Sequence, residues 1–189
     1  MNIKSLLAAT FAVASMSMLS MAQTRTIEHE YSEFDAISVS DGFKVSFVES
    51  DGYSAKFKVN DAFESYVQCY VKAGTLYIGV DDKSIPKEVK KSFKGKNSDD
   101  PVLEATVYVP SLKAVTLSDN CTFSCDKDIN APKFTLELSG TSSVSNLNIH
   151  VAESAVITVS KKAKLSSVNV KAEDKVTVNA EGNASVVLE

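Results

Sequence analysis

Apolar and polar residues alternate along most of this chain, and from Val115 to Val187 the alternation comes in repeated copies. An apolar–polar–apolar triplet followed by a small polar residue opens at Val115, Leu136, Ile157 and Val176. Eight positions after each opening comes a second apolar or small residue followed by serine, at Phe123, Val144, Leu165 and Ala184. The openings are 21, 21 and 19 residues apart. This period suits one turn of a β-solenoid, so we expect the openings to stack in an internal column, with Leu117, Leu138, Val159 and Val178 in a second.

The front of the chain alternates in the same way but with bulkier side chains. Between Phe34 and Val59 the apolar runs are separated by Asp-Gly pairs at Asp41 and Asp51. Alternation bounded by such turn dipeptides predicts strands. No aromatic residue follows Phe134. The sequence therefore predicts an all-β fold, a β-solenoid whose N-terminal half is more irregular and rich in aromatic residues.

The first 22 residues have the features of a signal peptide. A basic lead ends at Lys4, an uncharged run extends from Leu6 to Leu19, and small residues at Ser20 and Ala22 suit a signal peptidase. A membrane anchor is the alternative, but polar residues dilute the run. We expect cleavage before Gln23, no transmembrane span in the mature chain, and an exported protein in the periplasm, at the cell surface or outside the cell.

Residues 23–189 are enough for one domain. We expect a single β-solenoid domain with three parts: residues 23–80 with the aromatic strands and first coils, the charged lysine-rich insertion 81–101, and the regular coils 102–189 of about 21 residues each.

The insertion is the one stretch without strand alternation. Six lysines and a single acid, Glu88, lie between residues 83 and 96, and Pro86 followed by Val89 and Phe93 predicts a short amphipathic helix. Two interpretations stay open: a solvated insertion, or contact with an anionic lipid or polysaccharide surface. The second interpretation would use Lys87, Lys90, Lys91 and Lys94.

The charge balance argues against a nucleic-acid partner. The chain has 20 basic and 24 acidic residues, a net charge of −4, and removal of Lys4 with the signal leaves 19 against 24, or −5. Arg25 is the only arginine, and arginine is the side chain best suited to bidentate recognition of phosphate.

Cys69, Cys121 and Cys125 are an odd number of cysteines for an oxidising compartment. Cys121 and Cys125 would share one face of a strand. They could form a disulfide if the chain bends, or all three cysteines could be small buried apolar residues.

Several short motifs resemble one bacterial family in their order along the chain. They are Phe34-x-x-Ile37-x-Val39-Ser40, Gly42-Phe43-x-Val45, Gly74-Thr-Leu76-Tyr-Ile78, Val109-Pro110-Ser-Leu112 and the recurrent apolar-x-apolar-Ser coils. The family is the putative auto-transporter adhesin, head GIN domain, which is common in Bacteroidetes, and the resemblance covers nearly all of the mature chain. It implies an exported, single-stranded right-handed parallel β-helix without established catalytic residues. The chain departs from the family pattern where glycine usually follows the coil serine, because only Ser139-Gly140 has it.

Catalytic and metal chemistry find little support in the sequence. His29 and His150 belong to no cluster with ligand spacing, and neither CxxC nor HExxH occurs. Polysaccharide cleavage needs paired carboxylates, or a base with cationic partners, whereas the coils present mostly Ser, Thr, Asn and Lys. We therefore expect no catalytic, cofactor-binding or metal-binding residues and no enzymatic activity.

Binding is the remaining class of function. Hydroxyl and amide groups on flat strands can hydrogen-bond a repetitive partner, but sugar binding normally adds an aromatic platform, which only the front half can supply. We therefore take Tyr53, Tyr70, Tyr77 and Tyr108 as candidate ligand contacts.

Two functions follow from these features. The first is an exported, non-enzymatic, adhesin-like module whose β-solenoid scaffold presents a Ser/Thr/Asn surface to a glycan, lipid or protein surface. The alternative is a periplasmic small-molecule or lipid-binding protein that uses the aromatic N-terminal half. Homo-oligomer formation through the apolar terminal coil, Val176 to Leu188, is a further expectation.

Overall fold

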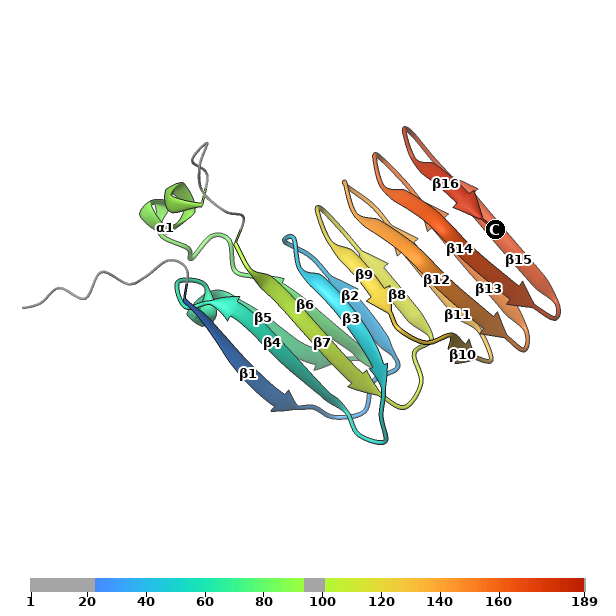
Figure 1. The fold of residues 1–189 in the computed structure, drawn as a ribbon, viewed down its shortest axis with the longest axis horizontal. Helices are drawn as coiled ribbons and strands as arrows, with labels where there is room; N and C mark the ends of the chain where they lie inside the picture. Colours follow the sequence, from blue (N-terminus) through green and yellow to red (C-terminus); the bar gives the residue numbers. More distant parts are fainter. Residues whose placement is uncertain (1–22, 94–100, 189) are drawn as a thin grey trace, which may run out of the picture.

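The computed structural model describes residues 23–93 and 101–188, so the predicted signal peptide and Lys94 lie outside the described residues. The described residues form an all-β fold of two mostly parallel sheets, a nine-stranded sheet A and a seven-stranded sheet B (Figure 1). Sheet A contains β1 (Thr24–Glu30), β3 (Lys44–Glu49), β4 (Ser54–Asn60), β7 (Leu103–Val109), β9 (Thr122–Cys125), β10 (Ile129–Ala131), β12 (Ser143–Val151), β14 (Lys164–Ala172) and β16 (Ser185–Leu188).

Sheet B has the strand order β15-β13-β11-β8-β2-β6-β5. Its strands are β2 (Ala36–Val39), β5 (Val67–Lys72), β6 (Thr75–Val80), β8 (Ala114–Leu117), β11 (Phe134–Leu138), β13 (Ser154–Val159) and β15 (Lys175–Ala180). Two short helices accompany the sheets, η1 (Glu64–Tyr66) and α1 (Lys87–Ser92). Pro86 precedes α1, as its spacing to Val89 and Phe93 predicts.

From β8 onward the chain passes alternately from sheet B to sheet A. Four repeat units result: β8 with β9 and β10, β11 with β12, β13 with β14, and β15 with β16. Each unit pairs in parallel with the unit before it. Antiparallel pairing in the described part of the chain is confined to β1 with β4, β4 with β7, and β5 with β6. The alternating residues thus form strands, and each repeat unit depends on the neighbouring units to pair these strands.

The strand register confirms the repeat but corrects its fourth copy. Val115 pairs with Leu136 and Leu136 with Ile157, each 21 residues on, as predicted. Ile157 then pairs with Val178 and not with Val176, so the spacing stays at 21. In sheet A, Leu165 pairs with Val186 in place of the expected Ala184. A shift of two residues keeps every side chain on the same face, so the hydrophobic pattern could not distinguish the two registers.

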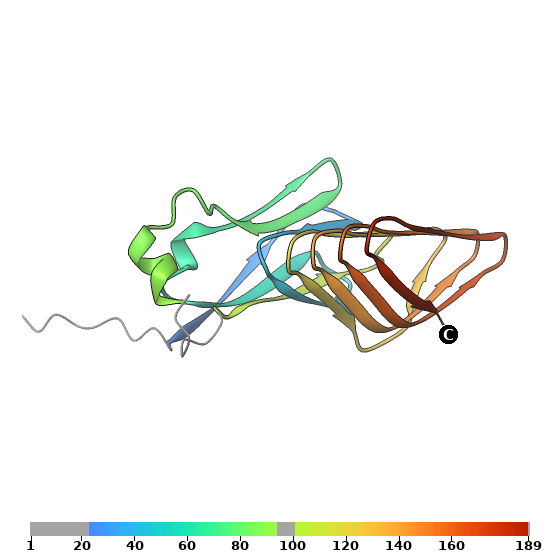
Figure 2. The same cartoon turned by 90° about the horizontal axis from the view of Figure 1, so that it is seen from above.

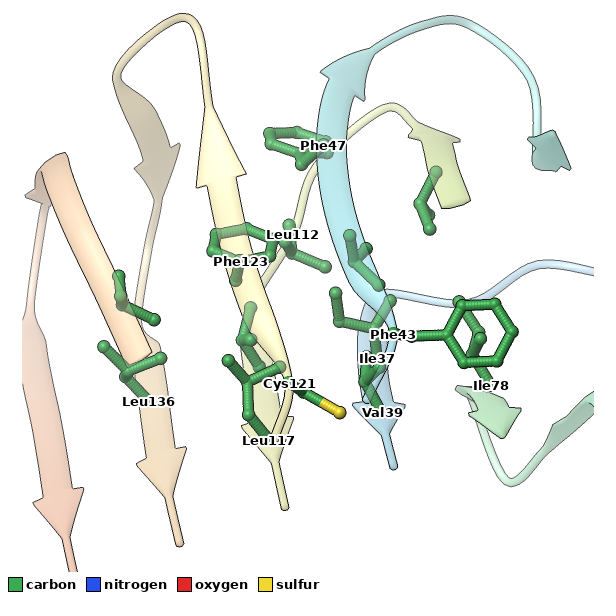
Figure 3. Packing of buried hydrophobic residues seen from close by; sticks show 14 of the residues in the cluster. Ile37, Val39, Phe43, Phe47, Ile78, Leu112, Leu117, Cys121, Phe123 and Leu136 are labelled. Carbon is green, nitrogen blue, oxygen red and sulfur yellow. The ribbon is translucent and has the colours of Figure 1, made fainter. Parts of the chain in front are cut away.

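Apolar columns between the two sheets form the core. Val115, Leu136 and Ile157 are fully buried, as are the residues of the next column, Leu117 and Val159. Figure 3 shows side chains of these columns facing those of sheet A, with Phe47 of β3 and Phe123 of β9 among them, and Phe43 from the turn before β3. The aromatic residues of the front half pack in separate pairs, Phe34 with Tyr53, Phe43 with Phe57, Phe63 with Phe93 and Tyr70 with Tyr77.

The strands of the front half do not follow one another in sequence order within the sheets. Strand β2 lies between β6 and β8 in sheet B, and β3 lies between β7 and β9 in sheet A, so residues 36–49 sit between segments that follow them in the sequence. The helix α1 lies at the end of the molecule away from β15 and β16, which Figures 1 and 2 show from two directions. No helix in the described ranges is long and apolar enough to cross a membrane.

Candidate functional site

A row of side chains crosses the outer face of sheet B from edge to edge. Along β2, β6, β8, β11 and β13 the inward neighbours are buried, so the residues between them point outward. Ladder pairing places Tyr70 of β5 and Asn179 of β15 on the same face. The strand register aligns one outward residue from each strand. We call this set the outer row of sheet B: Tyr70, Tyr77, Ser38, Thr116, Glu137, Thr158 and Asn179.

The outer row begins with a stacked pair of tyrosines. Tyr70 on the edge strand β5 is directly opposite Tyr77 on β6. Their ring centroids are 5.1 Å apart and the ring planes differ by 15°. Tyr70 is 49% exposed and is the one aromatic residue among the exposed large hydrophobic residues that the structure describes. Cross-strand aromatic pairs stabilise a sheet, and this one also leaves apolar ring surface open to solvent.

A hollow of about 110 Å³ lies beside the tyrosine pair. Its polar lining comes from Ser38, Ser40, Asp41 and Gln68. Gly79 makes room for two of these side chains, because a Cβ atom there would lie 2.5 Å from Ser40 Oγ and 2.8 Å from Asp41 Oδ2. Glycine within a strand is typical of a place where another group approaches the backbone closely.

The Asp41 carboxylate is held in place by two hydrogen bonds. Its Oδ2 accepts one from the Ser40 hydroxyl at 2.6 Å and one from the Val80 backbone N–H at 3.0 Å. Asp41 has a positive φ of 62°, a conformation that aspartate tolerates better than most residues. In the sequence Asp41 indicates only a turn, and Gly79 belongs to no predicted site. A glycine at an outward strand position was the signal that could have identified the hollow.

The structure separates the four tyrosines that the sequence suggested as ligand contacts. Tyr70 and Tyr77 come together, whereas Tyr108 lies on the outer face of sheet A, opposite Ser54 of β4. Tyr53 packs edge-to-face on Phe34, with ring centroids 5.7 Å apart. Burial and the nearby Glu33 carboxylate raise the Tyr53 pKa. Only the sheet B pair therefore forms a joint aromatic surface among these four residues.

The lysines of the insertion divide into two kinds. Lys87 and Lys91 are exposed on α1, whereas the Lys90 ammonium forms an ion pair with Asp82 at 2.8 Å. Lys94 is not among the described residues. Contact of this lysine set with an anionic surface stays a prediction.

A second cavity, of about 190 Å³, lies where the insertion meets the ends of β6 and β7. Its walls are largely apolar and include Phe63, Val80, Ile85, Phe93 and Leu103. The Phe63 and Phe93 rings pack edge-to-face with their centroids 5.0 Å apart.

The three cysteines are free thiols in the structure, so the bridge between Cys121 and Cys125 is not formed. Cys125 donates a hydrogen bond to the Lys127 carbonyl at 2.8 Å. Cys121 is fully buried at a corner of its repeat unit, and Ser142 and Ala163 occupy the same position in the next two units and are also fully buried. The corner thus requires a small side chain, and burial raises the pKa of the Cys121 thiol to about 11.

Comparison with protein families gives one match, the family described as "Putative auto-transporter adhesin, head GIN domain", over residues 33–188. The chain belongs to this family. The resemblance noted from the short sequence motifs is thereby confirmed. The match to the GIN-domain family extends from just before β2 to the end of β16.

Solved structures share the GIN-domain fold. A protein titled a putative adhesin from Bacteroides fragilis superposes with a TM-score of 0.54 at 12% sequence identity, over 89% of this chain and 98% of that one. One titled a putative cell adhesion protein from Clostridium sporogenes gives a TM-score of 0.53 at 11% identity, over 88% of this chain and 99% of that one. At such identities the likeness concerns the fold alone. Comparison with curated proteins finds no match.

Few titratable groups gather at the site of this GIN-domain chain, where Asp41 is the charged residue that lines the hollow. Within the described ranges no group of three or more His, Cys, Asp or Glu residues could hold a metal ion. Burial raises the pKa of the Cys69 thiol to about 11, which keeps it protonated and weakly nucleophilic. Ring surface, hydroxyls, an amide and one carboxylate line the hollow beside the tyrosine pair.

Proposed function

We propose that the protein is an exported, non-enzymatic, adhesin-like binding module. In this proposal the two sheets are the walls of a right-handed β-solenoid, a stiff scaffold that presents a Ser/Thr/Asn surface. The observation that carries the proposal is the outer row of sheet B, which stays in register across all seven strands of that sheet.

The row suits binding to a repetitive partner for a geometric reason. Adjacent strands lie about 4.8 Å apart, so the row repeats hydroxyl, carboxylate and amide groups at nearly constant spacing. Contacts that are individually weak add up when several engage at once on a rigid support. Membership of an adhesin family and the cell-adhesion name of the Clostridium sporogenes protein support this proposal.

Retention of the mature chain, residues 23–189, on bacterial cells, mucin-type glycoprotein and extracellular matrix tests the proposal. The informative variant combines Thr116→Arg and Thr158→Arg, which place bulky charges in the middle of the outer row. Its matched control combines Ser145→Arg and Ser166→Arg, which are exposed and paired with each other on sheet A. We expect the first variant to lose retention and the second to keep it. No retention of the wild type above an inert protein, or equal retention of both variants, would refute the proposal.

Export is tested separately by fractionating cells that produce the full chain with a C-terminal tag. We expect a mature form that begins at Gln23 in the periplasm, at the surface or in the medium. A full-length product confined to the cytoplasm is the contrary result.

A second function, binding of a small apolar molecule or lipid, is favoured by one observation. The cavity between the insertion and the ends of β6 and β7 has largely apolar walls. Phe43 and Phe57 of the aromatic N-terminal half pack on each other in the core, so the site would be the cavity with Phe63 and Phe93. Native mass spectrometry of the purified protein should show a bound small molecule that Ile85→Trp expels. A bare protein mass would count against this function.

Self-association through the terminal repeat unit is also proposed. The described strand orders end at β15 and β16, where Val176, Val178 and Leu188 are 38–40% exposed. Unpaired strand edges with apolar side chains favour pairing with a second copy. Light scattering should then give a dimer mass that Val178→Lys reduces to the monomer, whereas a monomeric wild type would exclude the interface.

A further inference from the structure

We propose that Tyr70, Tyr77 and the adjacent hollow form a subsite for one neutral sugar ring of an oligosaccharide. This inference rests on the proposed binding function and names its ligand class. It joins three features of the molecule: exposed aromatic surface, an adjacent hollow, and polar groups fixed around that hollow in the space left by the missing Cβ of Gly79.

The chemistry of a pyranose matches this combination. One face of the ring carries C–H bonds and packs on an aromatic side chain, whereas the rim carries hydroxyl groups that donate and accept hydrogen bonds. The tyrosine pair supplies the aromatic surface, 49% exposed at Tyr70. Asp41 accepts hydrogen bonds, and Ser40 and the Gln68 amide can donate or accept them, all within the lining of one hollow.

The charge of the site favours a neutral sugar over an acidic one. Asp41 is the charged residue in the lining of the hollow, and the outer row brings a second carboxylate at Glu137. Lys72 also points outward from β5, but it is opposite Thr75 in the neighbouring row and does not line the hollow. A uronic or sulfated ring would therefore bring its negative charge against the Asp41 carboxylate.

The subsite is already formed without a ligand. Asp41 is fixed by Ser40 and by the Val80 N–H, and Tyr70 and Tyr77 stand on strands joined by ladder hydrogen bonds. Groups held in this way lose little conformational entropy when a ligand binds. Gly79 belongs to the same arrangement, because its missing Cβ leaves the space that the Ser40 hydroxyl and the Asp41 carboxylate occupy beside the hollow.

The outer row gives the proposed subsite a direction. From Tyr77 the register leads to Ser38, Thr116 and onward, so an oligosaccharide anchored at the tyrosines can continue across sheet B on hydroxyl groups. The anchor would contribute most of the affinity per ring, because the apolar contact is concentrated there and water competes strongly for the polar contacts beyond it.

Titration of the mature protein with cellohexaose, laminarihexaose and mannohexaose, followed by NMR amide shifts and calorimetry, tests this inference. A hexamer of galacturonic acid is the charged comparison. We expect at least one neutral oligosaccharide to shift amides of residues 68–80, and the acidic one to bind more weakly. Tyr70→Ala and Asp41→Asn should each weaken binding by about tenfold or more. Tyr108→Ala, a tyrosine removed from the outer face of sheet A, is the matched control and should stay within about twofold.

Folding of each variant is checked by circular dichroism and thermal melting. Tyr70→Thr keeps a side chain that favours strands and replaces Tyr70→Ala if the alanine variant is destabilised. Two outcomes overturn the subsite: no neutral oligosaccharide perturbs residues 68–80, or the Tyr70 and Asp41 variants bind as the wild type does. If retention on cells persists and still depends on Thr116 and Thr158, only the subsite is wrong. If retention also fails, the binding function itself is wrong.

Discussion

Substitution of Gly140 tests how tightly the corners of neighbouring repeat units fit together. Gly140 has a φ of +72°, and a Cβ atom there would lie 2.6–2.7 Å from the backbone of Asp119 in the preceding unit. Gly182 occupies the equivalent corner two units later with a φ of +70°, but its Cβ would lie 3.4–3.5 Å from the Lys161 backbone, an ordinary contact. Alanine at either position meets the same backbone strain, and only at Gly140 does it also collide.

Backbone strain and steric overlap together determine how much stability each substitution costs. An L-residue in the left-handed region costs about 1–2 kcal/mol, which is the whole effect expected for Gly182→Ala. Overpacking against a backbone that cannot rotate away adds about 1–3 kcal/mol at Gly140. Gly140→Ala should therefore lower the free energy of unfolding by about 2–5 kcal/mol.

Urea denaturation followed by far-UV circular dichroism measures both variants. The difference between them should be about 1–3 kcal/mol, or roughly 2–12 °C in Tm for a chain of this size, with an unchanged m-value. Equal destabilisation by the two substitutions would refute the reasoning, because it would show that the corner at Asp119 is as open as the corner at Lys161.

Three further predictions concern the core and the thiols. Leu136→Ala should lower the free energy of unfolding by about 2–5 kcal/mol in urea titrations, because Leu136 is fully buried, whereas Leu188→Ala at a 40% exposed position should cost less than about 1 kcal/mol. Cys121→Ala should be tolerated because Ala163 fills the same corner two units on, whereas Cys121→Val should cost about 1–3 kcal/mol by overpacking. Thermal melting compares the two variants, and equal Tm values for valine and alanine would contradict this prediction. Burial raises the pKa of the Cys69 and Cys121 thiols from 9.0 to about 11, so the folded state holds these protons more tightly than the unfolded state. Stability should therefore be constant below about pH 9 and fall as the pH rises through 11, and a Cys69→Ala/Cys121→Ala variant should show a shallower fall in urea titrations across this range.

The repeat could be predicted from the sequence because it is a local pattern with a fixed period. The columns through Val115 and Leu117 follow from alternation and from the 21-residue spacing alone. The error of two residues at Val176 arose where Val176, Val178 and the residues around them fit either register. Parallel pairing to Ile157 determines the choice, and that is a non-local interaction.

The candidate site was only half predictable. Tyr70 and Tyr77 are candidates from the sequence because the tyrosines are confined to the front of the chain. The local sequence does not indicate that these two residues pair across strands, or that Tyr108 lies on the other sheet. The hollow beside them needs Ser40, Asp41 and Gly79, which are brought together when β2 pairs with β6. Chain segments some forty residues apart meet at this hollow, and hydrophobic periodicity cannot predict such a contact.

The position of β2 and β3 among later strands determines the order in which the protein can fold. Residues 36–49 are synthesised early, yet their neighbours on one side are β6 and β7 and on the other β8 and β9. One flank can be covered once β7 ends at Val109, but the other stays open until Cys125 ends β9. All residues up to Cys125 must therefore be available before this part of the fold can close, and its bare strand edges are open to wrong pairing during that interval. The units after β9 face no such delay, because each finds its template already in place.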